Sequence, residues 1–224
     1  MRSWRRWRLE WPILAGPETA LPVVALVVFT GLHATLPRSG AESWARLFVE
    51  NCQSLLPLAL ALAAVPALLR DAEHGTVEAA IVLPSRAVLA TRLAVILGGG
   101  GALCAAWLGV LALLWGPVAF GAGLWAAAGP TLFLAGLGLL LASASGRSTV
   151  GYLAVIGWAT GDLVLRLLGA FRAVPALQWC DVFAFRWPLP APGWPAVAGG
   201  QGAFGAALLL ATLLAARPLL RRLL

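Results

Sequence analysis

The side chains between Arg70 and Arg92 are the ones whose types and spacing could do chemistry in this sequence. In the stretch RDAEHGTVEAAIVLPSRAVLATR, acids and arginines interrupt a chain that is otherwise apolar. The charged members are Arg70, Asp71, Glu73, Glu78, Arg86 and Arg92. Gly75 and Thr76 break the run, because Thr can cap the helix that follows, and Pro84 ends that helix. The pattern predicts a short, rigid, charged elbow between two apolar segments, which suits a surface for a partner protein.

Catalytic and metal-binding alternatives for these residues are weaker. His74 and Glu78 lie four residues apart, and Glu73 is adjacent to His74. A zinc site would need more nitrogen or sulfur ligands, so we interpret these residues as a solvated charged face and predict no metal site. The sequence contains no nucleophile motif and no Walker A motif, so we expect neither an enzyme nor a chain that hydrolyses nucleotide itself.

The composition is that of an integral membrane protein. Hydrophobic residues make up 61% of the 224 residues, charged residues 11%, and the mean hydropathy is +0.88. A soluble domain carries about 25% charged residues. The net charge of +7 comes entirely from arginines placed between apolar runs, which is not how a nucleic-acid-binding face is built. We therefore predict an all-α membrane protein that contacts the lipid bilayer and no nucleic acid.

Six apolar runs are interpreted as membrane spans, and the first of them has about the length needed to cross a bilayer. They cover residues 19–36, 55–69, 93–115, 124–142, 150–168 and 203–216, with the sixth expected to begin somewhat before residue 203. Four glycines at 98–101 favour close helix packing in the third span. We predict six transmembrane helices within a single domain, residues 1–224, and the elbow 70–92 between the second and third spans.

Two further segments flank these spans. Residues 1–18 mix arginines with tryptophans, which favours an amphipathic helix in the headgroup layer, with a plain positive-inside anchor as the alternative. Residues 169–200 are rich in aromatic residues and prolines. This stretch is too apolar for a free loop and too broken for a spanning helix, so we predict that it is re-entrant and returns to the side from which it entered.

The fifth span carries the charged residues Asp162 and Arg166 at a spacing of four. Charges inside a span are costly and are functional candidates, here for lining a transport pathway. The alternative, which we favour, is that Arg166 extends to the interface while Asp162 neutralises it. Cys52 and Cys180 are expected on the same side of the membrane, where a disulfide between them is an open alternative.

The distribution of arginines predicts the orientation. The N-terminal arginines, those of the elbow, Arg147 and the C-terminal group fall on one side of a six-span chain, and fewer fall on the other. The positive-inside rule places the richer side in the cytoplasm. Both termini and the elbow are therefore predicted to be cytoplasmic, and the segment 169–200 external.

The elbow resembles the signature of ABC-2 type transporter permeases. The matching residues are Arg70, Asp71, Glu73, Gly75, Thr76, Glu78, Pro84, Ser85, Arg86 and Arg92. The six-span layout, the basic N-terminal segment and the broken segment between spans five and six are also similar to that family. Asp71 and Arg92 depart from the commoner Glu and Lys without a change of charge.

The resemblance implies a permease of the bacterial inner (cytoplasmic) membrane. It would pair with a second permease, identical or related, on two copies of a separate ATPase subunit, which would bind ATP and Mg. The elbow would be the coupling helix, with Glu73, Gly75, Thr76 and Glu78 at the ATPase interface and Arg86 and Arg92 holding the elbow against the next helix. Spans two and five would line the path of an exported hydrophobic or amphipathic substrate, and the external aromatic segment would cover that path.

Three alternatives remain open at this stage. One is a haem-export-like subunit of cytochrome c maturation, which shares a similar elbow. The second is an intramembrane enzyme that uses Asp71, Glu73, His74 or Asp162. The third is a purely structural scaffold.

Overall fold

The computed structural model describes residues 17–35, 54–66, 69, 86–115, 118–185, 187, 189 and 192–223. These residues form helices and turns, with no strand among them. The elements are η1 (Pro17–Ala20), α2 (Leu21–Thr35), a short helix Ser54–Ala64 (helix 54–64), α6 (Arg86–Trp115), α7 (Phe120–Ser145), α8 (Ser148–Leu167), α9 (Ala170–Ala173), η2 (Pro175–Cys180) and α10 (Trp194–Leu223). Residues 1–16 of the predicted interfacial segment, and residues 70–85 of the elbow, lie outside the described ranges.

Four of the described helices are long and apolar enough to cross a membrane. Their spanning parts are Leu89–Leu113, Phe120–Ser145, Ser148–Leu167 and Trp194–Ala215. They correspond to the third to sixth apolar runs of the sequence. Shorter apolar helices cover Pro17–Val28 and Ser54–Ala64, within the first two runs. The chain is therefore an all-helical membrane protein in the part that the structure describes.

The last helix begins earlier than the sequence predicted. Helix α10 starts at Trp194, so residues 194–200 belong to this helix and not to the broken segment before it. The glycines at 199 and 200 are tolerated in the helix because it packs tightly there: a Cβ atom added to Gly200 would lie 2.7 Å from the Trp179 ring. Tertiary contact overrides the low helix propensity of this stretch.

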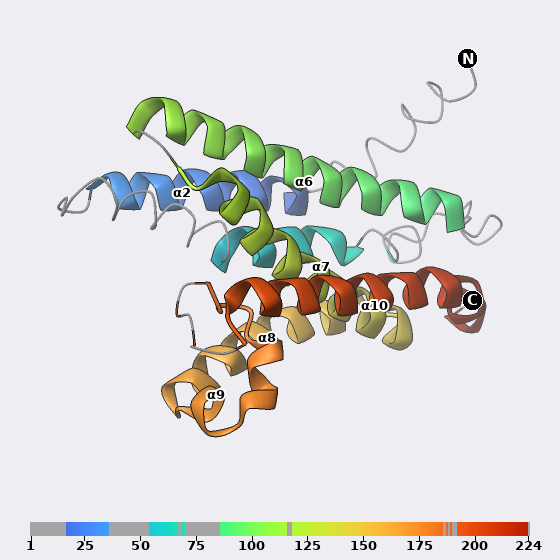
Figure 1. The fold of residues 1–224 in the computed structure, drawn as a ribbon. Coiled ribbons are helices and arrows are strands. Elements are labelled where there is room, and N and C mark those ends of the chain that lie inside the picture. Colours follow the sequence, from blue (N-terminus) through green and yellow to red (C-terminus); the bar gives the residue numbers. More distant parts are fainter. Residues whose placement is uncertain are drawn as a thin grey trace, which may run out of the picture.

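Successive long helices run in opposite directions (Figure 1). Gly146, in the left-handed conformation, ends α7 and allows α8 to turn back along it. Leu60 contacts Gly100, while Leu69, Leu89 and Leu93 belong to one cluster, so residues 54–69 run antiparallel to α6. The residues on either side of the undescribed part of the elbow, 69 and 86, thus lie at the same end of the bundle. We call it the elbow end, and we call the opposite end, which holds α9 and η2, the α9 end.

Helices α7 and α10 run parallel and pack through glycines. A Cβ atom added to Gly129 would lie 2.1 Å from the Ala198 carbonyl oxygen, and one added to Gly205 would lie 2.3 Å from the Leu132 carbonyl carbon. The two backbones approach this closely only because no side chain stands between them.

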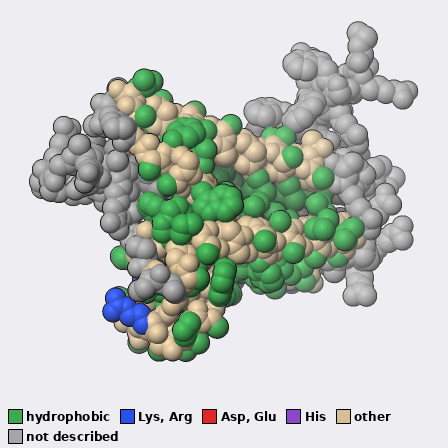
Figure 2. Space-filling view, viewed as in Figure 1, with side chains coloured by type: hydrophobic (Ala, Val, Ile, Leu, Met, Phe, Trp, Pro, Cys, Tyr) green, Lys and Arg blue, Asp and Glu red, His purple; other side chains and the backbone are tan. Residues whose placement is uncertain are grey.

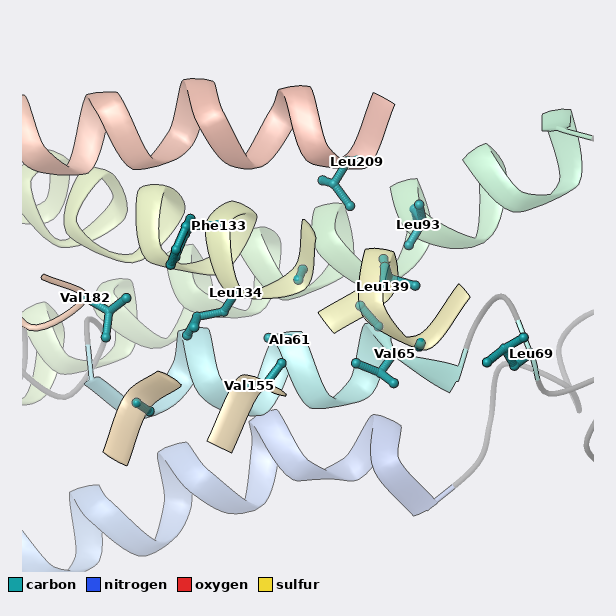
Figure 3. Packing of buried hydrophobic residues seen from close by; sticks show 14 of the residues in the cluster. Ala61, Val65, Leu69, Leu93, Phe133, Leu134, Leu139, Val155, Val182 and Leu209 are labelled. Atoms are coloured by element: carbon teal, nitrogen blue, oxygen red, sulfur yellow. The ribbon is translucent and has the colours of Figure 1, made fainter. Parts of the chain in front are cut away.

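A buried apolar core joins the helices (Figure 3). It takes residues from helix 54–64, α6, α7, α8 and α10, and Val182 from the turn after η2. Its labelled members in Figure 3 are Ala61, Val65, Leu69, Leu93, Phe133, Leu134, Leu139, Val155, Val182 and Leu209. The segment between α8 and α10 is therefore packed into the bundle and is not a loose connection.

The outer surface is itself largely apolar, as the green surface in Figure 2 shows. Large exposed side chains include Leu153, Leu163, Leu167, Phe204 and Leu214, on α8 and α10. Exposed apolar side chains on spanning helices are expected where the solvent is lipid. The blue patch in Figure 2 lies beside the α9 end, where α9 carries the exposed Arg172.

Candidate functional site at the α9 end

Three charged residues of the α9 end, Asp162, Arg166 and Asp181, form one cluster. Arg166, in the last turn of α8, donates from Nη2 to the Oδ2 atom of Asp181, which directly follows η2. The Arg166 side chain is 16% exposed and that of Asp181 1%. The second Asp181 oxygen, Oδ1, accepts a hydrogen bond from the Phe183 backbone N–H at 3.0 Å. The sequence did not single out Asp181 as a site residue.

Arg166 lies between two aromatic rings. Its guanidinium carbon is 5.2 Å from the centre of the Phe171 ring and 5.1 Å from that of Trp187. Nη1 also donates to the Trp187 carbonyl oxygen at 3.0 Å. These contacts hold the arginine against the protein.

Asp162, the acid that the sequence placed beside Arg166, is not its ion-pair partner among the described residues. The ion pair of Arg166 is with Asp181, because the chain after α8 folds back over the end of that helix and brings a second carboxylate to it. Asp162 is 3% exposed, and its Oδ2 atom accepts no hydrogen bond from the described protein atoms. Its carboxylate lies against the Val182 backbone and the Asp181 side chain.

Burial raises the pKa of the Asp181 carboxyl. The hydrogen bond and charge of Arg166 act in the opposite direction, and burial is the larger effect. Burial and the nearby Asp162 also raise the pKa of the Cys180 thiol. Cys180 is a free thiol and half-buried, and Cys52 lies outside the described residues.

Neutral hydrogen bonds attach the same segment to two helices. The Trp158 Nε1 atom, on α8, donates to the Cys180 carbonyl at 3.2 Å, and the Gln201 Nε2 atom, on α10, donates to the Trp179 carbonyl at 3.3 Å. Gln178 closes the segment on itself by donating to the Phe171 carbonyl at 2.8 Å. We call residues 169–185 together with Trp187 the cap segment, since they cover the end of α8 and are bonded to α8 and α10.

The predicted coupling residues are placed as follows. Asp71, Glu73, Gly75, Thr76, Glu78 and Pro84 lie outside the described residues. Arg86 is the first residue of α6. Arg92 is 3% exposed, one residue before the core residue Leu93, near the elbow end of the bundle. Of this set, the structure therefore separates Arg92 from Asp162 and Arg166, which lie at the α9 end.

Among the described residues, no group of three His, Cys, Asp or Glu side chains could hold a metal ion. Asp162 and Asp181 are both almost fully buried, which leaves neither carboxylate open to a substrate in this conformation. The cluster as it stands can hold the cap segment and bind a proton.

Comparisons with protein-family models, curated proteins and solved structures give no match to this chain.

Proposed function

We propose that this chain is the membrane-spanning subunit of an ATP-driven exporter of the ABC-2 type, with six spans and cytoplasmic termini. In this proposal two permeases form the path for a hydrophobic or amphipathic substrate. The ATP and Mg are bound by two copies of a separate ATPase subunit. The support in the sequence is the charged elbow with its Gly75-Thr76-x-Glu78 core and its Pro84-Ser85-Arg86 turn.

The observation that carries the proposal is the position of the elbow's two attachment points. Leu69 precedes the elbow and Leu89 belongs to the part of it that forms the first turn of α6, and both are buried in the same core cluster. A motion of the segment between them would therefore act on residues 54–69 and α6 at once. A lever of this kind is what a partner ATPase requires to move membrane helices.

The second support is the separation of the two charged regions. The cap segment and the residues that flank the undescribed part of the elbow, Leu69 and Arg86, lie at opposite ends of helices that are long enough to span a bilayer. An exporter needs this arrangement, because the ATPase acts on one side and the substrate leaves on the other. A buried arginine in α6, Arg92, fits a role in fixing the helix that receives the motion.

The experiment is co-purification of the full chain in mild detergent, followed by measurement of ATP hydrolysis. We expect an ATPase subunit to accompany the permease and its turnover to rise when the permease is present. Glu73→Arg should abolish this rise, because the reversed charge would oppose docking. Glu42→Arg is the matched control. It reverses a charge between the first two apolar runs, on the side of the membrane predicted to be external, and should leave the rise in ATP hydrolysis intact.

An activity that persists in the purified chain without nucleotide or ATPase would instead support an intramembrane enzyme. Equal effects of Glu73→Arg and Glu42→Arg on the ATPase would contradict the proposed role of the elbow.

A further inference from the structure

Among the residues that the structure describes, the buried cluster at the α9 end contains more acid than base. Two carboxylates, Asp162 and Asp181, lie near a single guanidinium, that of Arg166. With both acids ionised, the cluster would keep an uncompensated negative charge at positions that are 3% and 1% exposed. An unpaired buried charge is strongly unfavourable, and two carboxylates that share one site cannot both ionise easily.

No other described group supplies the missing positive charge. Helices α7 and α10 pack against this region, and residues 120–145 and 194–215 contain no Asp, Glu, His, Lys or Arg. From the cap segment, the Cys180 thiol lies near enough for Asp162 to act on it, but a thiol carries no positive charge. Arg172 of α9 is exposed and is not among the charges that act on either aspartate.

The hydrogen bonds indicate where a proton is needed. Both Asp181 oxygens already accept hydrogen bonds, one from Arg166 and one from the Phe183 N–H. The Asp162 carboxyl meets the Asp181 side chain, and its own Oδ2 atom has no donor among the described protein atoms. A carboxylate is only an acceptor, so two carboxyl groups can bond to each other only if one of them carries a proton.

We propose that Asp162 and Asp181 form a proton-binding site, and that the single proton they share keeps the cap segment closed over the end of α8. The proton completes the charge balance: one neutral carboxyl, one carboxylate and one guanidinium. When the neutral carboxyl gives its proton to water, two carboxylates remain beside Arg166. The additional charge then favours movement of the cap segment away from α8, where the aspartates regain water.

The direction of the pH dependence follows from this scheme. The closed cap segment binds one proton more than the open one, so acid stabilises closure and a rise in pH promotes opening. The site does not depend on the proposed ATPase, and its test uses the purified full chain alone. If the chain shows no shared proton, the proposed transport function is unaffected. If no ATPase binds the chain, the proposed proton-binding site is unaffected.

The first experiment detects the proton directly. Infrared difference spectroscopy of the chain in lipid nanodiscs resolves the C=O stretch of a protonated carboxylic acid from the amide bands. At neutral pH, where exposed acids are ionised, we expect the signal of one protonated carboxyl per chain. Asp162→Asn should remove it, and Glu18→Gln, an acid of η1 away from the cluster, should not. The absence of this signal from the wild-type chain at neutral pH, or its persistence in both Asp162→Asn and Asp181→Asn, would overturn the proposal.

The second experiment measures opening of the cap segment. Hydrogen exchange at the Phe183 amide, corrected for the intrinsic effect of pH, should speed up by tenfold or more as the shared proton is lost. In Asp162→Asn, where the amide replaces the protonated carboxyl with the same shape, exchange should stay slow over the same pH range. A corrected rate that is independent of pH in the wild-type chain would contradict the proposal that the shared proton keeps the cap segment closed. An identical pH dependence in the two proteins would contradict it as well.

Discussion

The contact between α7 and α10 and the contact between α8 and the cap segment hold the molecule together by different means. The first has no charged residue along residues 120–145 and 194–215, and depends on glycines that let two backbones meet. The second joins neighbouring parts of the chain through an ion pair, aromatic rings around an arginine and several hydrogen bonds. A steric contact is the same at every pH, whereas a contact made of ionisable groups responds to protonation. The α7–α10 contact should therefore be weakened by added side-chain bulk, and the contact of α8 with the cap segment by changes of charge or pH.

The largest effect is expected from Arg166→Met. The substitution removes the only described cation of the cluster and leaves two buried acids behind. Breaking a buried pair by removing one partner costs about 3 kcal/mol or more. We expect the free energy of unfolding, measured by denaturant titration in detergent, to fall by about that amount. Arg172→Met, at an exposed arginine six residues along the chain, is the control and should change it by less than about 0.5 kcal/mol. Similar losses in the two variants would mean that the buried charge balance is unimportant.

A smaller effect is expected from Gly205→Ala at the α7–α10 contact. The added Cβ atom would lie 2.3–2.5 Å from backbone atoms of Leu132 and Phe133, which cannot turn aside as a flexible side chain could. Overpacking of this kind costs about 2 kcal/mol, and the loss should be independent of pH. Gly161→Ala, on α8, meets nothing within 4 Å and should be neutral or slightly stabilising. A pH-dependent loss in Gly205→Ala would erase the distinction between the two regions.

The smallest effect on stability is expected from Asp162→Asn. At neutral pH the amide replaces a carboxyl that already carries a proton, so the free energy of unfolding should change by less than about 0.5 kcal/mol. The difference should appear as pH rises: the wild-type chain loses stability when the shared proton dissociates, and the variant does not. The unfolding temperature of both proteins, measured across a pH series, tests this difference in pH dependence. Parallel plots of unfolding temperature against pH for the two proteins would contradict the prediction.

The sequence predicted the helices well, because apolar runs of spanning length have few alternatives. The run 124–142 lies inside α7, and the run 150–168 differs from α8 by two residues at its start and one at its end. The packing between helices was not predictable in the same way. Where every side chain is apolar, periodicity does not show which face meets a neighbour, and nothing in the sequence pairs Gly129 with Ala198 or Gly205 with Leu132.

The polar cluster was predicted only in part, for a related reason. Spacing along a helix indicates the partners of Arg166 on the same helix, and Asp162 was the candidate there. Asp181 lies 15 residues away, beyond a turn at Gly169 and two short helices. Only the folding back of the cap segment brings it to Arg166. One sequence signal was present: Asp181 is an acid in an aromatic, apolar stretch, where a lone charge needs a partner.

The central claim is that the elbow binds an ATPase at the end of the molecule opposite to the cap segment. Photo-cross-linking from single introduced residues tests it most directly, with the reactive group at position 76 in the elbow or at position 172 on α9. We predict that in intact membranes position 76 cross-links to a subunit that binds ATP, and that position 172 does not. Cross-linking of position 172 to such a subunit, or accessibility of position 76 from the same side as position 172, would contradict the account.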